Sequence, residues 1–506
     1  MRFALIILIA VFLSALSGAE ISNGQLQLEM LVTEAVKINI SHMDSLGKEI
    51  KGQLTLIDAE GFSTEIYSNK LALELVSEKS EIVWGILNST QRLDSTSVEK
   101  SEDLNLRNRF AWENGKLTII REKLVFEDKY FSTRSDAEKY AQETGYPLKQ
   151  VQSIPMQNAR MRAVADKGKI HYLQLPVEIR CAGSISFNGN EIKYHNTRFL
   201  VKQANDKLQV TNLVALESYL CDVVPYEIGH EAPTEALKAQ AVAARTHSVS
   251  LLLMNRHLDD GYDLCQGTHC QVYKPGLPVP ERIISAVTDT EGLVMIYEDR
   301  IADGVYHSCC GGKTETNQAA WNGKPIPYLQ GVACCSELDD LDLTIETNAI
   351  KQLDTQTDTT GMTSWEKRAA SWERTISRQS LASDLKVKNL HAMRILSRGN
   401  SGRILKLKLI GSNEVTIEGE YKIRQALGGL PSSFFYVKNG RRTSTATYTL
   451  PEKITVKGKG FGHGVGLCQV GALRKARSGW QWRDILTTYY PGISISGDWL
   501  DQQSGK

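Results

Sequence analysis

The chain has 506 residues, with 59 Lys and Arg against 58 Asp and Glu, so its formal net charge is +1. Hydrophobic residues make up 42% of it and charged residues 23%, a balance that excludes a wholly disordered, collagen-like or coiled-coil protein. The near-zero net charge argues against a general nucleic-acid binder, which usually has a clear basic excess. The length predicts about three domains.

The N-terminal segment predicts export. Met1 and Arg2 precede an apolar run from Phe3 to Leu16, and small residues at 17–19 offer a cleavage site. This pattern is typical of a secretory signal peptide. The run is shorter than the roughly 20 apolar residues of a transmembrane helix, although an uncleaved anchor remains the alternative. We expect residues 1–19 to be removed, and the mature chain to reach the periplasm or cell envelope without a membrane span.

Residues 20–170 form a predicted β-rich N-terminal region whose role the sequence does not indicate. Short runs of β type at Gln53–Ile57, Leu71–Val76 and Lys116–Ile120 are bounded by Gly, Asn or charged residues, as strands usually are. The stretch Arg134–Thr144 has the composition of a helix, and Gly145 is its expected C-cap.

Residues 171–500 read as one domain that mixes strands and helices. Alternating runs predict strands near 170–180, 190–201 and 207–214. A long helix is predicted from 232–234 to about Asn255, because Pro233 suits a first turn and good helix formers follow. The small Ala residues at 239–244 would let a neighbouring backbone approach this helix closely.

The remaining segments complete an α+β prediction. Residues 341–375 are polar and suggest a surface excursion or a mobile lid. Strand-like runs return at 403–410 and 414–417, and a Gly-rich turn over 458–466 precedes a predicted helix at 469–477. We therefore expect an α+β fold, with a mixed helical and β-rich catalytic domain after a β-rich N-terminal region.

Six ordered blocks carry a specific resemblance. They begin with LESYLCDVVPYEIGHEAPTEALKAQAVAARTHS at 216–248 and DLCQGTHCQVY at 263–273, continue with HSCCGGKTE at 307–315, PYL at 327–329 and the residues around 424–433, and end with GKGFGHGVGLCQVGA at 458–472. Over roughly 175–500 the chain resembles the SpoIID/LytB family, the stage II sporulation protein D group of lytic transglycosylases. The first 150 or so mature residues lie outside the resemblance.

The resemblance places a catalytic carboxyl at Glu227. Cleaving the MurNAc–GlcNAc β-1,4 bond without water needs one acid that protonates the leaving oxygen, then accepts the C6 hydroxyl proton to leave a 1,6-anhydro end. The apolar neighbours at 223–225 and Ile228, which stands where the family usually has Met, predict a pKa raised by desolvation. The alternatives are that Glu227 only begins a helix, favoured by the macrodipole, and that Glu231 is the acid.

The resemblance also implies contacts with the glycan. It places basic cleft residues at Lys238 and Arg245, which a spacing of seven puts on one helix face. A solvated basic stripe is the alternative. Ser308, His463 and Gln469 match family blocks and are candidates to hydrogen-bond the glycan, unless they belong to structural turns.

Glycines and aromatic residues add weaker signals. The turn at 458–466 lacks the Lys-Ser/Thr ending of a P-loop, so we expect no nucleotide site there. Its glycines would allow a sharp turn and a close approach to a sugar. Trp321, Tyr328 and Tyr489 are candidates for stacking on sugar rings or for the core.

A cysteine- and histidine-rich segment suggests a metal. Cys265, His269 and Cys270 form a C-x3-H-C pattern, and His257 lies eight residues upstream. Thiolates and imidazoles suit Zn²⁺, and some members of the family hold zinc through such residues. Adjacent His269 and Cys270 are not easily joined to one ion, however. The alternatives are a Cys265–Cys270 disulfide, the competing explanation in an oxidising compartment, and free thiols. No cofactor is expected to take part in catalysis, and zinc here would be structural.

The other cysteines leave their pairing open. The chain has nine cysteines, an odd number, so in an exported protein at least one is unpaired or has another task. The doublets Cys309-Cys310 and Cys334-Cys335 could bridge each other.

The leading hypothesis is an exported lytic transglycosylase that acts on peptidoglycan glycan strands. By family analogy its substrate would be strands that a cell-wall amidase has stripped of stem peptides. The rival hypothesis is a non-catalytic wall-binding protein that enhances an amidase. A zinc hydrolase is disfavoured because the chain has no HExxH-type pair. We expect glycan strands and a cell-wall amidase as partners, and no nucleic acid.

Overall fold

A computed structural model describes residues 207–500 except Leu277 and 335–340, and most of 21–204 in segments whose longest gaps are 44–48, 77–82, 93–105 and 155–159. The expected signal peptide lies outside the described residues. The chain divides into two compact units: unit 1 comprises Met1–Tyr226, Ser248–Ile284 and Gly497–Lys506, and unit 2 comprises Glu227–His247 and Ser285–Ser496.

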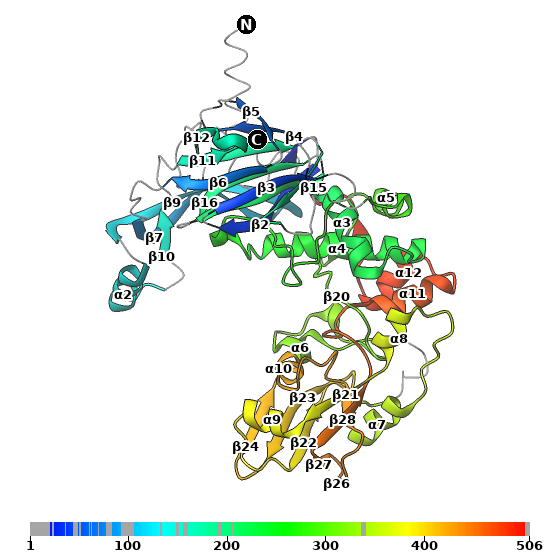
Figure 1. Cartoon of the computed structure of the whole chain (residues 1–506). Coiled ribbons are helices and arrows are strands. Elements are labelled where there is room, and N and C mark those ends of the chain that lie inside the picture. The colour runs from blue at the N-terminus through cyan, green and yellow to red at the C-terminus, as the bar shows by residue number, and fades with distance from the viewer. Residues whose placement is uncertain are drawn as a thin grey trace. The chain divides into compact units, whose positions relative to one another are not determined.

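Unit 1 is built on antiparallel sheets (Figure 1). The seven-stranded sheet has the order β1 (Ile21–Ser22), β2 (Gln25–Ala35), β17 (Lys207–Ala215), β16 (Arg198–Ala204), β13 (Val177–Cys181), β4 (Gly52–Ile57), β5 (Ser63–Ser68). The six-stranded sheet has the order β12 (Ile170–Gln174), β11 (Arg160–Val164), β6 (Lys70–Val76), β3 (Lys37–Met43), β14 (Ser184–Phe187), β15 (Tyr194–His195). The four-stranded sheet has the order β10 (Val151–Ile154), β7 (Val83–Arg92), β9 (Lys116–Phe131), β8 (Leu106–Glu113).

The first of these sheets corrects the domain boundary that the sequence suggested. β17 pairs with β2 from Leu208↔Ala35 to Ala215↔Gln27, and β13 pairs with β4. Strands from both sides of residue 170 therefore share one hydrogen-bonded ladder. Residues 20–170 and the strands that follow them are one folding unit, so the boundary near 170 does not divide the fold.

The predicted helices that lead into the site are present. α2 (Arg134–Thr144) has the expected bounds, and Gly145 follows it with φ of +80°, as a left-handed C-cap requires. Among the described residues up to 288, the other helical elements are the 3₁₀ turns η2 (Asp166–Gly168) and η3 (Leu258–Asp260) and the helices α3 (Leu216–Ile228), α4 (Thr234–Leu253) and α5 (Glu281–Thr288). α4 confirms the long Ala-rich helix.

Unit 2 combines small sheets with short helices. Its five-stranded sheet has the order β24 (Glu414–Glu418), β23 (Ile404–Ile410), β22 (Ala392–Arg398), β27 (Thr447–Thr449), β26 (Arg442–Ser444). Two three-stranded sheets have the orders β21 (Trp372–Ser377), β28 (Lys453–Gly458), β25 (Phe435–Val437) and β19 (Arg300–Ile301), β18 (Val294–Tyr297), β30 (Ser494–Ser496). The strands β20 (Tyr306–His307) and β29 (Leu467–Cys468) form a parallel pair. Its helices are α6 (Asn317–Trp321), the 3₁₀ turn η4 (Pro327–Leu329), α7 (Glu346–Asp354), α8 (Ser364–Ala370), α9 (Arg378–Asp384), α10 (Glu420–Ala426), α11 (Gln469–Arg477) and α12 (Trp482–Tyr489).

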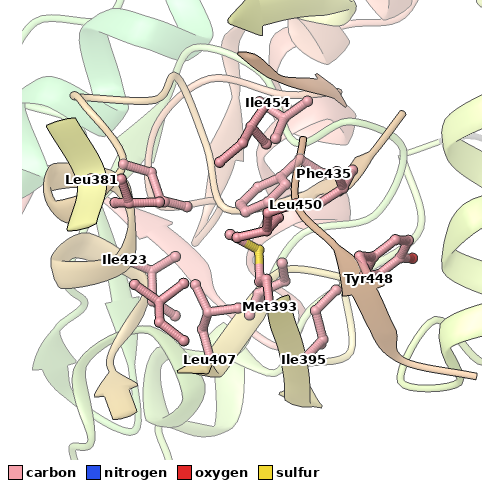
Figure 2. Packing of buried hydrophobic residues seen from close by; sticks show 14 of the residues in the cluster. Leu381, Met393, Ile395, Leu407, Ile423, Phe435, Tyr448, Leu450 and Ile454 are labelled. Atoms are coloured by element: carbon pink, nitrogen blue, oxygen red, sulfur yellow. The ribbon is translucent and has the colours of Figure 1, made fainter. Parts of the chain in front are cut away.

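A hydrophobic core holds the larger sheets of unit 2 together. Met393, Leu407, Ile423, Phe435 and Ile454 converge from separate strands and from α10 (Figure 2). All five side chains are fully buried. The expected strands at 403–410 and 414–417 are β23 and β24, and the α+β prediction is confirmed.

The polar segment 341–375, which the sequence suggested as a surface excursion or a mobile lid, is largely exposed but contains two short helices. It carries α7 and α8, and its Leu343 and Leu353 pack with Phe434 in a small buried cluster. At α8, Thr363 caps the helix together with Glu366, whose carboxylate also accepts from Arg477 at 2.7 and 2.9 Å. A helix cap and an ion pair between buried Glu366 and the more exposed Arg477 help to hold this segment, which is poor in apolar residues.

Candidate functional site

Glu227 lies in the last turn of α3. Val223 and Val224 are fully buried one turn earlier, and Ile228 is 3% exposed, whereas the Glu227 side chain is half-buried. Gly229 follows with φ of +98° and ends the helix. Since α4 begins only at Thr234, Glu227 does not begin a helix, and that alternative interpretation is wrong. A helix C-terminus carries partial negative charge, the opposite of a site that would attract a carboxylate.

A second carboxyl of α3 was missed by the sequence reasoning. Burial raises the pKa of Asp222 to about 7. Tyr194, Tyr226 and Tyr273 lie near enough to it to feel its charge. Strongly raised carboxyl pKa values are typical of functional sites, although buried structural carboxyls have them too. Its only sequence signal was its place in an apolar run five residues before Glu227.

Lys238 and Arg245 share one face of α4, as their spacing predicted, but both contact protein. Lys238 Nζ pairs with Asp289 Oδ2 at 2.9 Å. Arg245 is fully buried and donates to the carbonyl oxygens of Leu293 at 3.1 Å and Val287 at 3.4 Å. The two cations thus bind the segment 287–293 to α4. The burial of Arg245 leaves its guanidinium inaccessible to a glycan in this arrangement.

The small residues of α4 have the effect that was predicted. Gly304 lies against the helix, where a Cβ would sit 2.4 Å from the carbonyl oxygen of Ala243. Thr246 Oγ1 accepts the backbone N–H of Met295 at 3.0 Å. Neighbouring backbone therefore packs directly on α4.

The Gly-rich turn closes around a buried arginine that the sequence did not reveal. Arg403 is fully buried and donates to the carbonyl oxygen of Cys310 at 2.9 Å. A Cβ at Gly464 would lie 2.5 Å from the Arg403 guanidinium carbon, and one at Gly466 would lie 2.0 Å from the carbonyl oxygen of Val305. Both glycines have positive φ. Contacts within the protein, rather than with a sugar, thus account for the glycines at these positions.

His463 uses both ring nitrogens within the protein. Its Nδ1 accepts the N–H of Val465 at 3.1 Å, so its Nε2 carries the proton and donates to the carbonyl oxygen of Tyr306 at 2.9 Å. Burial holds the pKa of His463 well below its usual range. The ring is neutral and fixed, and no ring nitrogen is left for the predicted hydrogen bond to glycan.

The remaining residues predicted to contact glycan differ in how exposed their side chains are. Ser308 is half-buried, whereas Gln469 is 2% exposed and its side chain donates weakly to Gln240 of α4 at 3.4 Å. Tyr328 and Tyr489 are buried and belong to the core. Trp321 is 47% exposed, with its ring centroid 5.1 Å from that of His463. Of the three aromatic candidates, Trp321 alone presents an open ring face.

Four potential metal ligands converge in unit 1. The Sγ atom of Cys270 lies 3.6 Å from Cys265 Sγ, 3.4 Å from His257 Nε2 and 3.9 Å from His269 Nδ1. Tetrahedral zinc with bonds of about 2.0–2.3 Å separates its ligand atoms by roughly 3.3–3.8 Å. The four residues fit such an ion, and adjacent His269 and Cys270 both reach the cluster, contrary to expectation.

The surroundings of the cluster also suit zinc. His257 Nδ1 contacts Asp260 Oδ2 at 2.8 Å, which turns Nε2 toward the thiols. Carboxylates commonly orient zinc-bound imidazoles in this way. Cys265 and Cys270 are free thiols here, and their separation far exceeds the roughly 2.05 Å of a disulfide bond.

Comparison with known proteins confirms the resemblance. Residues 204–297 match the stage II sporulation protein family SpoIID. Residues 315–466 match a domain of unknown function (DUF8618).

Individual relatives agree with the family match. The chain is 28% identical to stage II sporulation protein D of Bacillus subtilis, over 56% of this chain and 75% of that protein. It is also 28% identical to an uncharacterized protein of Brachyspira hyodysenteriae, over 61% of this chain and 74% of the relative. For the amidase enhancer of Bacillus subtilis the identity is again 28%, over 54% of this chain but only 40% of the relative. Within the described residues, no helix is long and apolar enough to cross a membrane.

Proposed function

We propose that this chain is an exported peptidoglycan lytic transglycosylase whose single acid/base is Glu227. The observation that carries the proposal is the setting of this carboxyl. It is half-buried at the C-terminal end of α3, next to buried Val223, Val224 and Ile228. Apolar surroundings and the negative end of a helix both disfavour a carboxylate, and a general acid must be protonated before it reacts.

The reaction needs no water and no second carboxyl. Glu227 donates its proton to the oxygen that links MurNAc C1 to GlcNAc, and that bond breaks as positive charge develops at C1. The MurNAc C6 hydroxyl then bonds to C1, and its proton passes to the Glu227 carboxylate. The products are a free GlcNAc hydroxyl and a 1,6-anhydro-MurNAc end, and the enzyme regains its starting protonation state. This differs from glycoside hydrolysis, which uses two carboxyls and a water molecule.

The exposure of each candidate side chain decides which residues we propose to contact the glycan. Trp321, with its open ring face, is the aromatic residue we propose to stack on a sugar ring, and Ser308 is the polar candidate. Arg245, His463 and Gln469 are assigned to the framework, because their polar groups are buried or already bonded within the protein. Lys238 stays a candidate because its partner Asp289 is 48% exposed and the pair can open toward a ligand.

A structural zinc ion belongs to the same proposal. His257, Cys265, His269 and Cys270 would hold it, with Asp260 orienting His257. When bound, zinc would crosslink the loop 257–270 and supply folding free energy without taking part in the glycan chemistry.

A second candidate function is enhancement of a cell-wall amidase without catalysis. The observation in its favour is the similarity to a relative named amidase enhancer. On this view Glu227 would be dispensable, and the chain would bind glycan and recruit or stimulate the amidase.

The products distinguish the two candidates. Sacculi are first treated with an amidase, then incubated with the purified chain, and the released fragments are analysed by mass spectrometry. The transglycosylase proposal expects 1,6-anhydro-MurNAc ends that increase with time. Absence of anhydro ends, together with faster peptide release when the chain and the amidase are incubated with sacculi at the same time, would contradict it and support the enhancer.

A further inference from the structure

A second group of thiols and an imidazole lies in the interior of unit 2. The ligand atoms of His307, Cys310 and Cys468 all lie within 4.8 Å of one another. The three side chains are 4%, 1% and 1% exposed. Cys334 also contacts the thiols of Cys310 and Cys468. None of these residues was assigned a role in binding or catalysis above, apart from their place in family blocks.

The backbone brings the imidazole and one thiol together. His307 and Cys468 are direct partners in the parallel pair of β20 and β29. Each strand has only two residues, and so small a ladder is marginal by itself. A bond through a shared ion would fix this pair, which joins the start of α11 to the segment 306–310.

The histidine has an unused buried nitrogen. His307 Nδ1 donates to the carbonyl oxygen of Val465 at 3.0 Å, so Nε2 is unprotonated in the neutral ring. Among the described residues, Nε2 is buried without a conventional hydrogen-bond partner. An imidazole held through one nitrogen by a backbone carbonyl, with the other nitrogen facing thiols, is the usual arrangement of a metal-bound histidine.

The sulfur atoms accept backbone hydrogen bonds in the manner of thiolates. Cys468 Sγ accepts from the N–H of Cys310 at 3.2 Å and from the N–H of Gly471 at 3.3 Å. Cys310 Sγ accepts from the N–H of Gly312 at 3.3 Å. Thiols are weak acceptors, whereas thiolates, the form that binds metals, accept well.

We propose that His307, Cys310, Cys334 and Cys468 bind a second Zn²⁺ ion. Cys334 is the fourth ligand because its side chain interacts with both of the other thiols in the set, Cys310 and Cys468. Cys309 contacts Cys468 and is not assigned as a ligand. A Cys₃His set in which three side chains are buried and Cys334 is partly buried suits a structural zinc site. The site is independent of the cluster in unit 1 and of the proposed reaction.

The alternative is oxidation of the same thiols. The sequence suggested bridges between the doublets 309–310 and 334–335. Cys309, Cys310 and Cys334 are free in the structure, and Cys335 lies outside the described residues. Free thiols gathered around the unprotonated Nε2 of His307 favour a metal. A disulfide bridge would instead leave that nitrogen buried and unsatisfied.

The full-length wild-type protein provides a test that does not depend on a variant's folding. Purified without chelators, it should carry about two zinc ions per chain. X-ray absorption at the zinc edge should find more sulfur than nitrogen, because the two sites together offer five thiolates and three imidazoles. About one zinc per chain with equal sulfur and nitrogen would overturn the proposal, because the unit 1 cluster alone explains that result.

Single substitutions then locate the second ion. Cys468→Ser and Cys334→Ser should each lose about one zinc per chain, and Cys309→Ser, a neighbouring buried thiol, is the matched control that should keep both. Should Cys468→Ser fail to fold, the wild-type absorption result still decides. A non-reducing peptide map that joins Cys310 or Cys468 to another cysteine would also overturn the proposal.

Discussion

Asp222 and Glu227 are two carboxyls of one helix in different settings. Glu227 lies in the last turn of α3, whereas Asp222 lies in its middle, where burial raises its pKa to about 7. An unfolded aspartyl group titrates near 3.9. Between those values the folded state keeps a proton that the unfolded state has lost, so raising the pH through this window destabilises the fold.

This difference predicts a pH-dependent effect of Asp222→Asn. At pH 8 the variant should be more stable than the wild type by about 1–3 kcal/mol, because it no longer buries a carboxylate. At pH 4 the two proteins should be nearly equal. Urea unfolding at several pH values measures the difference, in which the other titrating groups largely cancel. A difference that does not change between pH 4 and pH 8 would contradict the raised pKa.

The residue scale also shows what the sequence could not reveal. Glu227 stood out because its apolar neighbours are adjacent in the chain. For His463 and Arg245, the residue type and family position suggested ligand binding, but the deciding contacts come from distant backbone carbonyls. Arg403 gave no signal at all, because a buried guanidinium at the start of a strand looks like an exposed one in the sequence.

Among the elements, α4 depends on close backbone contacts. Because a Cβ on Gly304 would sit 2.4 Å from the Ala243 carbonyl oxygen, Gly304→Ala must displace the chain from the helix. We expect the free energy of unfolding to fall by about 1–3 kcal/mol. Gly323→Ala is the control, since a Cβ there would meet its nearest neighbour at an ordinary 3.7 Å. Equal stability of the two variants would show that the contact is not tight.

The stability of the loop 257–270 should depend on the zinc ion that we propose there. If zinc is bound there, Cys270→Ser loses about one zinc per chain and unfolds at a lower temperature, because structural zinc contributes directly to folding. Cys181→Ser, which removes a buried thiol outside both clusters, should keep its zinc. Metal analysis and thermal unfolding report the two effects. A Cys265–Cys270 crosslink in a peptide map of metal-free protein would refute this prediction.

Individual helices and strands were the features that the sequence predicted best. The helices α2 and α11 have the predicted bounds, because caps and helix-forming residues are local signals. The polarity of the segment 341–375 could be read from the sequence, but the ion pair of its Glu366 with Arg477, 111 residues further along the chain, could not. The cluster of four potential metal ligands was partly predictable, since these residues lie within 14 residues of chain.

At the scale of the whole molecule, long-range pairing decides the organisation. The boundary expected near residue 170 failed because β2 and β4 pair with β17 and β13, and no local pattern announces partners more than 100 residues apart. The division into two units could not be predicted from the sequence either. Each boundary between the units falls inside a helix, α3, α4 or α5, and not in a linker.

The central claim is that Glu227 is the acid and base of a glycan lyase. Glu227→Gln keeps the size of the side chain and removes the transferable proton, so it should lose at least the upper part of the 10²–10⁴-fold that general acid–base catalysis typically contributes. Glu231→Gln, which changes an exposed carboxylate, should keep most activity, and Asp222→Asn tests the competing carboxyl. Mass spectrometry of amidase-treated sacculi counts the anhydro ends that each protein releases. The account predicts that Glu227→Gln produces almost none while it still folds and binds stripped glycan. Anhydro ends from Glu227→Gln at near the wild-type rate, or their loss only in Asp222→Asn, would contradict it.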